Sequence, residues 1–102
     1  GGKGAEAEIL MRDDGAIAEI TILQGGSGYM DGDEIKILNG SGSDFLATVL
    51  VRNGVLDLNQ SHTIANGGSG YRVNDAVIVF DITDGSVWHG CRRCKIRGFF
   101  RN

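Results

Sequence analysis

The sequence predicts an all-β protein, and three observations support this prediction. The chain has 102 residues, of which 17 are glycine and none is proline. Glycine recurs so often that an amphipathic helix is hard to place between its occurrences. Apolar segments are short, and several alternate with polar residues in steps of two, as in Glu19-Ile20-Thr21-Ile22. A chain of this length has room for one domain or one short array of repeats.

Each predicted strand has the same local pattern. The segments are rich in β-branched residues or alternate in polarity, and each is bounded by Gly, Asn or Asp, which favour turns. Where the period is two, one face is buried and the other is exposed. We therefore expect roughly seven to nine short antiparallel strands, arranged as a sandwich or a small stacked-sheet array. In chain order, the clearest segments are residues 9–11, 16–23, 35–38, 45–51, 55–58 and 76–80.

The chain contains an internal repeat. The pentapeptide Gly-Gly-Ser-Gly-Tyr at residues 25–29 recurs 42 residues later, at 67–71. Upstream of each copy, residues 7–12 match residues 47–52, and a glycine-containing turn follows each of these segments. Each unit therefore reads as strand, glycine turn, strand, GGSGY loop and strand.

The repeated positions predict structural turns. Gly32 and Asn74 occupy the same slot after the two tyrosines, and both residue types tolerate positive φ, which we expect there. The following Asp33 and Asp75 are placed to accept backbone N–H bonds from their own turns. Glycines in the pentapeptides let backbones approach closely, while each tyrosine supplies an apolar body whose hydroxyl reaches a polar partner. The predicted structural-turn residues are Gly25, Gly26, Gly28, Tyr29, Gly32, Asp33, Gly67, Gly68, Gly70, Tyr71, Asn74 and Asp75.

The repeat and the charge distribution predict the organisation of the chain. Residues 1–86 form a β-repeat domain, with repeat one at about 1–39 and repeat two at about 40–80. Residues 87–102 form a basic, Cys-containing tail or assembly strand. Residues 1–90 hold all 13 acids but only five of the ten bases, so the tail is basic. Opposite charges favour docking of this tail on the acidic face of a neighbouring copy.

The pattern GGSGY-x-x-G-D-x-I-x-I, followed by a glycine-rich turn, an Ala-containing strand and a second GGSGY, resembles a known β repeat. This repeat is common in virion proteins of tailed phages, in tail-fibre, neck and baseplate-associated proteins, and in some bacterial surface proteins. The resemblance covers residues 4–80, with Asn74 where glycine is usual. It implies a structural part of a virion or of an extracellular assembly, and it gives no role to residues 88–95.

Little in the sequence points to catalysis, a cofactor or a metal. Gly26-Ser27-Gly28 lacks the third glycine of a dinucleotide-binding loop, and no phosphate-binding lysine follows. His89, Cys91 and Cys94 offer three zinc ligands where a structural site needs four. The acids at 31, 33 and 34 lack the spacing of a calcium loop. We therefore expect no enzyme activity, no cofactor and no metal; a disulfide formed by Cys91 and Cys94, within or between chains, is left open.

These observations favour a structural function. A net charge of −3 argues against nucleic-acid binding, and no apolar run approaches the ~20 residues of a membrane span. The ends of the repeat lack polar caps, which favours a protein that works in an assembly. We expect a structural subunit of a virion or extracellular fibre, which assembles through β-strand edges and tail docking with copies of itself or other structural subunits. The alternative is a carbohydrate-binding, adhesin-like module in which Tyr29, Tyr71 and Trp88 contact surface glycans.

Overall fold

The computed structural model describes residues 2–58, 62–88 and 95–98, and all regular secondary structure within these ranges is β. The all-β prediction is confirmed, and no helix within these ranges could cross a membrane. The strands are β1 (Lys3–Met11), β2 (Ile17–Ser27), β3 (Glu34–Ile37), β4 (Leu46–Thr48), β5 (Val51–Arg52), β6 (Val55–Leu56), β7 (Thr63–Asn66), β8 (Val79–Asp81), β9 (Ser86–Val87) and β10 (Ile96–Gly98).

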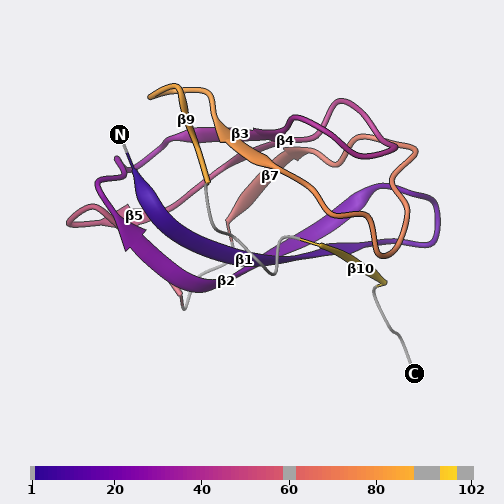
Figure 1. The fold of residues 1–102 in the computed structure, drawn as a ribbon, viewed down its shortest axis with the longest axis horizontal. Coiled ribbons are helices and arrows are strands. Elements are labelled where there is room, and N and C mark those ends of the chain that lie inside the picture. The colour runs from indigo at the N-terminus through magenta and orange to yellow at the C-terminus, as the bar shows by residue number, and fades with distance from the viewer. Residues whose placement is uncertain (1, 59–61, 89–94, 99–102) are drawn as a thin grey trace.

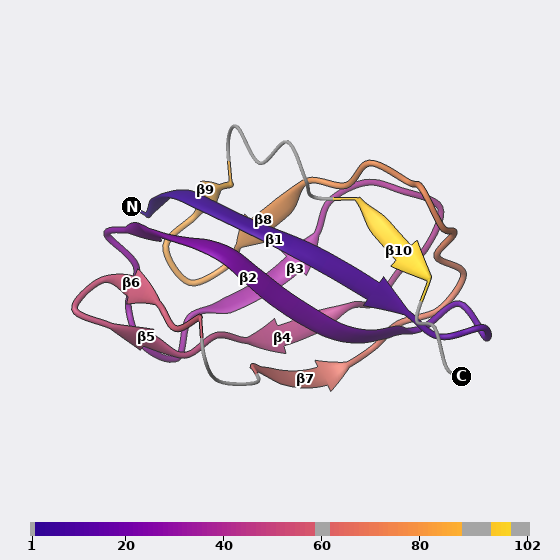
Figure 2. The same cartoon turned by 90° about the horizontal axis from the view of Figure 1, so that it is seen from below.

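The strands form two main sheets and a small ribbon. One sheet has the order β10-β1-β2, the second has the order β7-β4-β3-β8-β9, and β5 pairs with β6. Figure 1 shows the two main sheets as two layers, with β1 and β2 in one and β3 and β4 in the other. Seen at 90° to this view, the long strands β1 and β2 cross over the strands of the other layer (Figure 2).

The core lies between the layers and follows from the alternation along each strand. Every second residue of β1 from Ala5 to Met11 is buried. The facing sheet contributes Ile35, Ala47 and Val79, which are at most 1% exposed. Burial of an aliphatic side chain of the size of Ile35 or Val79 stabilises a fold by roughly 1.5–3 kcal/mol. The period-two pattern of the sequence therefore corresponds to one shared interior.

Two features of the first sheet differ from the expectation of short antiparallel strands. β1 and β2 have nine and eleven residues, because the start of the first pentapeptide continues β2 and pairs with the start of β1. The pairing of β1 with β10 is parallel, with Ile9 opposite Ile96. Alternation in a sequence identifies a strand and its buried face, but it carries no information about the direction of its partner.

Part of the segment predicted as a tail packs into the body. Trp88 is 3% exposed and Ile96 is fully buried, so both belong to the core. Arg97 of β10 also forms a 3.2 Å ion pair with Glu8 of β1. Cys91 and Cys94, whose disulfide was left open, lie outside the described residues.

Candidate functional site

The two GGSGY tyrosines are interior residues with matching surroundings. Tyr29 and Tyr71 are each 3% exposed. The backbone N–H of Ala5 donates to the Tyr29 hydroxyl at 3.3 Å, and the Tyr71 hydroxyl hydrogen-bonds with the backbone of Phe45. Burial raises the pKa of both tyrosines. The predicted role of these residues, an apolar body with a hydrogen-bonded hydroxyl, is confirmed at both positions.

The GGSGY loops hold the two halves of the chain together. The N–H of Tyr29 donates to the carbonyl of Gly54 at 3.0 Å, and the N–H of Tyr71 donates to the carbonyl of Gly15 at 3.0 Å. Each loop is thus bonded to the hairpin turn of the opposite half. The pentapeptide glycine Gly26 has φ +63°, and a Cβ there would lie closer than 3.0 Å to backbone atoms of β1. Close backbone approach is therefore the reason for glycine at this position.

The predicted turn conformations are also present. Gly32 has φ 87° and Asn74 has φ 76°, which confirms the positive φ expected at both. Asn53 and Gly54 have φ 51° and 81°, the pair required by a tight hairpin. Asp33 accepts from the N–H of Met30 at 3.2 Å, within its own turn as expected.

Three carboxyl groups meet where β3 begins and β8 ends. β3 and β8 are antiparallel neighbours, with Ile35 opposite Asp81, so the start of one lies beside the end of the other. Asp33 immediately precedes β3, Asp81 ends β8, and Asp84 lies in the turn before β9. One carboxylate oxygen from each of the three lies within 4.8 Å of the others. We call this group the Asp33–Asp81–Asp84 cluster.

Two members of the cluster are buried and only half satisfied. Asp33 is 1% exposed and Asp81 is 0% exposed, whereas Asp84 is exposed to solvent. Asp81 Oδ1 accepts from the N–H groups of Thr83 and Asp84, at 3.0 and 3.2 Å. Asp81 Oδ2 and Asp33 Oδ1 are buried without a hydrogen-bond partner. Because ionised carboxylates only accept hydrogen bonds, these two oxygens cannot satisfy each other unless they share a proton.

Protonation relieves part of this conflict. Burial, and then hydrogen bonding to the Asp33 carboxyl group, raises the pKa of Asp81 to about 7, while N–H donation from Asp84 opposes the rise. In contrast, Asp84 has a lowered pKa, because hydrogen bonds from Ser86 and from the backbone of Gly2 outweigh its partial burial. At neutral pH Asp84 is therefore ionised, whereas Asp81 is only partly ionised.

The acids that stand out in the sequence are not the ones that form the cluster. Of the group at 31, 33 and 34, only Asp33 belongs to the cluster; Asp31 Oδ1 accepts from Val51 N–H at 2.9 Å at the surface, and Glu34 is exposed. Asp81 and Asp84 were missed because they join Asp33 through strand pairing, across almost 50 residues. A comparison of the two repeats distinguishes these positions. Asn39 and Gly42 stand 42 residues before Asp81 and Asp84, so the acids are present in only one of the two copies.

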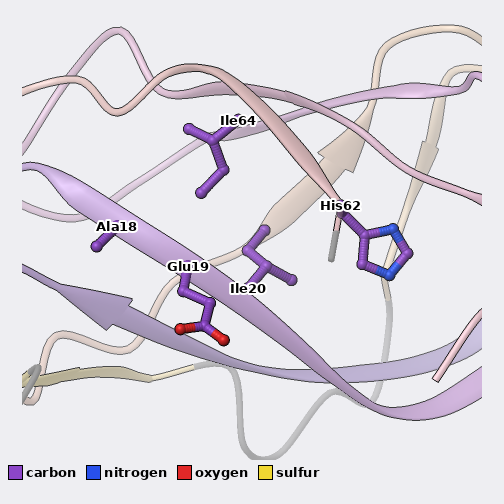
Figure 3. A pocket seen from close by; sticks show the side chains of 5 residues that line it. All are labelled: Ala18, Glu19, Ile20, His62 and Ile64. Carbon is purple, nitrogen blue, oxygen red and sulfur yellow. The ribbon is translucent and has the colours of Figure 1, made fainter. Parts of the chain in front are cut away.

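A second candidate is a pocket of about 320 Å³ between β2 and β7. Figure 3 shows its lining, Ala18, Glu19 and Ile20 from β2 with His62 and Ile64 from the segment that contains β7. His62 Nδ1 accepts from the N–H of Leu50 at 2.9 Å, and its Nε2 lies 3.0 Å from the carbonyl of Asp57. Both ring nitrogens are thus used by the backbone, and the histidine has a structural role.

Comparisons with known proteins gave no match: no protein-family model, no curated protein and no solved structure matches the chain.

Proposed function

We propose that the chain is a structural subunit that assembles with copies of itself, or with other structural subunits, in a virion or an extracellular appendage. The proposal depends chiefly on an exposed apolar strip on the outer face of the five-stranded sheet. Leu38, Ile78 and Ile82 are 50%, 44% and 41% exposed, and Phe80 between them is half-buried. The N–H of Leu38 donates to the carbonyl of Ile78, so the strip is continuous across β3 and β8. Clustered exposed apolar residues of this kind mark protein contacts.

The position of the strip fits assembly by β contacts. Residues 77–82 alternate between buried and exposed, so Ile78, Phe80 and Ile82 share the solvent-facing side. Lys36 covers part of the strip, with its ammonium 5.7 Å from the centre of the Phe80 ring. The same sheet ends at β7 and β9, which have no further strand partner among the described residues. Unpaired edges beside an apolar face invite pairing with another chain.

Two further observations support a structural function. The repeated pentapeptides are used inside the molecule, where their tyrosines and glycines join the two halves. The resemblance of GGSGY-x-x-G-D to a phage virion repeat suggests the same class of role. The carbohydrate-binding alternative depended on glycan contacts by Tyr29, Tyr71 and Trp88. All three side chains are only 3% exposed, so none of them is available at the surface to contact a glycan.

The test is self-association of the purified chain. We expect oligomers at micromolar concentration in sedimentation velocity, without added ligand, and particles or filaments by negative-stain microscopy. Ile78→Thr removes an apolar side chain from the strip while keeping a good strand former, and should weaken association at least about tenfold. Leu58→Ser, at a position 54% exposed outside the strip, is the matched control and should associate like the wild type. A chain that stays monomeric at every concentration, or equal association of both variants, contradicts the proposal.

Deletion of residues 88–102 is not a suitable test. Trp88 and Ile96 are core residues, so the deletion would destabilise the body as well as remove any docking segment. Substitution within the strip changes the contact surface and leaves the core intact.

A further inference from the structure

We propose that Asp33, Asp81 and Asp84 bind a divalent cation of the calcium class. This inference is independent of the proposed structural function, because it concerns a different part of the molecule and does not require assembly. It departs from the expectation of no metal, which considered only acids close together in the sequence.

The first argument is the unpartnered oxygen atoms. Asp33 Oδ1 and Asp81 Oδ2 belong to side chains that are 99% or more buried, and when both carboxyl groups are ionised neither oxygen has a hydrogen-bond donor. Buried carboxylates are normally paired with a cation or with donors. A bound cation would satisfy both atoms at once.

The second argument is geometric. One oxygen from each of the three carboxyl groups lies within 4.8 Å of the other two. Oxygens bound to one Ca²⁺ at 2.3–2.6 Å have separations of this size, and Ca²⁺ accepts irregular arrangements of six to eight oxygens. Mg²⁺ requires a tighter octahedral shell. Because Asp84 is exposed, solvent can reach the cluster on that side and water can complete the shell.

The third argument is that the carboxyl groups are already oriented. Asp33 Oδ2 accepts from Met30 N–H, and Asp81 Oδ1 accepts from two N–H groups of its own turn. Asp84 accepts from the N–H groups of Gly2 and Ser86, at 3.0 and 2.8 Å. These bonds use one oxygen of each buried carboxylate and leave the other without a donor. Ligands that are held by hydrogen bonds in this way lose little freedom when a cation binds.

A proton shared by Asp33 and Asp81 is the competing occupant. A proton joins two oxygens, whereas three carboxyl groups converge here. A divalent cation accounts for all three. The two occupants differ in their response to added calcium, which is what the experiment measures.

The experiment uses the full chain after removal of metal with a chelator. Calcium binding is measured by titration calorimetry and by the urea midpoint of unfolding, with and without CaCl₂. Tb³⁺, which takes calcium sites, provides an optical probe, because Trp88 is the sole tryptophan and its ring contacts Tyr29 at 6.1 Å between centroids. The pKa of Tyr29 is raised by burial and further by the charges of Asp81, Asp84 and Asp33. We expect saturable Ca²⁺ binding, a higher urea midpoint in calcium, and Tb³⁺ emission sensitised by these rings.

Variants assign the effect to the cluster. Asp81→Asn removes a ligand charge but keeps the shape, and an asparagine already occupies the corresponding position 42 residues earlier. This variant should fold in chelator and bind Ca²⁺ at least about tenfold more weakly, since even loss of an outer-shell partner costs 10–100-fold. Asp84→Asn changes an exposed residue and should weaken binding without affecting the core.

Asp75→Asn is the matched control. Asp75 corresponds to Asp33 in the other half, but it binds the N–H and hydroxyl of Ser41, and it should leave calcium affinity unchanged. The proposal is overturned if calcium changes neither the midpoint nor the heat signal of the wild type. It is equally overturned if a folded Asp84→Asn variant keeps wild-type affinity, or if Asp75→Asn loses affinity to the same extent.

Discussion

Without metal, the Asp33–Asp81–Asp84 cluster should make the protein less stable as the pH rises from 5 to 8. The pKa of Asp81 is about 7 in the folded chain, because of burial and its contact with Asp33, and about 3.9 in an unfolded chain. Between these values the folded state holds a proton that the unfolded state has lost. Since stability falls with pH wherever the folded state binds more protons, this contribution is present at acidic pH and lost by pH 8.

The magnitude follows from the two pKa values. One pH unit between them is worth about 1.4 kcal/mol, so the full contribution of Asp81 is about 4 kcal/mol, reached below the unfolded pKa. Between pH 5 and pH 8 the loss is about 2.5 kcal/mol. With a urea m-value of about 1–1.5 kcal/mol per M for a chain of this size, the midpoint should fall by roughly 2 M.

The assay is urea unfolding followed by tryptophan fluorescence, at pH 5 and pH 8 in chelator, for the wild type and Asp81→Asn. The difference between the two proteins cancels the titrations of groups that do not interact with Asp81. We expect a pH-dependent loss in the wild type that is largely absent from the variant, which cannot titrate at this position. An equal pH dependence in both proteins, or a wild type that gains stability toward pH 8 relative to the variant, would refute the reasoning about Asp81.

Four further substitutions concern stability and are measured by the same unfolding assay. Gly26→Ala should destabilise the fold by about 3 kcal/mol or more, because it combines positive φ with backbone contact. Gly85→Ala should cost only about 1 kcal/mol, since Gly85 has φ +76° but nothing within 4 Å of an added Cβ. An equal loss of stability in the two glycine variants would contradict a role for close backbone approach at Gly26. Tyr29→Phe should cost about 1 kcal/mol, as the N–H of Ala5 loses its acceptor, and an unchanged midpoint would contradict this bond. Arg97→Ala should change stability by less than about 1 kcal/mol, because its ion pair is solvent-exposed, and a larger loss would indicate a packing role for Arg97.

The sequence allowed those parts of the fold to be predicted that local chemistry determines. Positive φ at Gly32 and Asn74 and the burial of the tyrosines follow from residue type and spacing. Each depends on a turn or an alternation within a few residues, where sterics and burial act directly.

Long-range pairing is what the sequence did not specify. The parallel contact of β10 with β1 joins segments more than 80 residues apart, and the burial of Ile96 results from that contact. The Asp33–Asp81–Asp84 cluster has the same origin, because β3 and β8 bring its members together. An acid in a turn has the same local pattern whether it ends in solvent or beside another acid, so its environment depends on the partner strand.

The two halves of the chain differ at two positions, Asn39 against Asp81 and Gly42 against Asp84, which explains why only one half has a carboxylate cluster among the described residues. Asn39, which corresponds to Asp81, accepts from Ile78 N–H and donates its amide to the Ala76 carbonyl at 3.2 Å. An asparagine can both donate and accept, so its needs are met within the sheet. Aspartate at the same position can only accept, and Asp81 therefore retains one buried oxygen with nothing to bind. Asn39→Asp alone should not create a second cluster, because Ser41 already satisfies Asp75 in that half, and only the half that combines Asp81 with Asp84 has the converging charge that a cation requires.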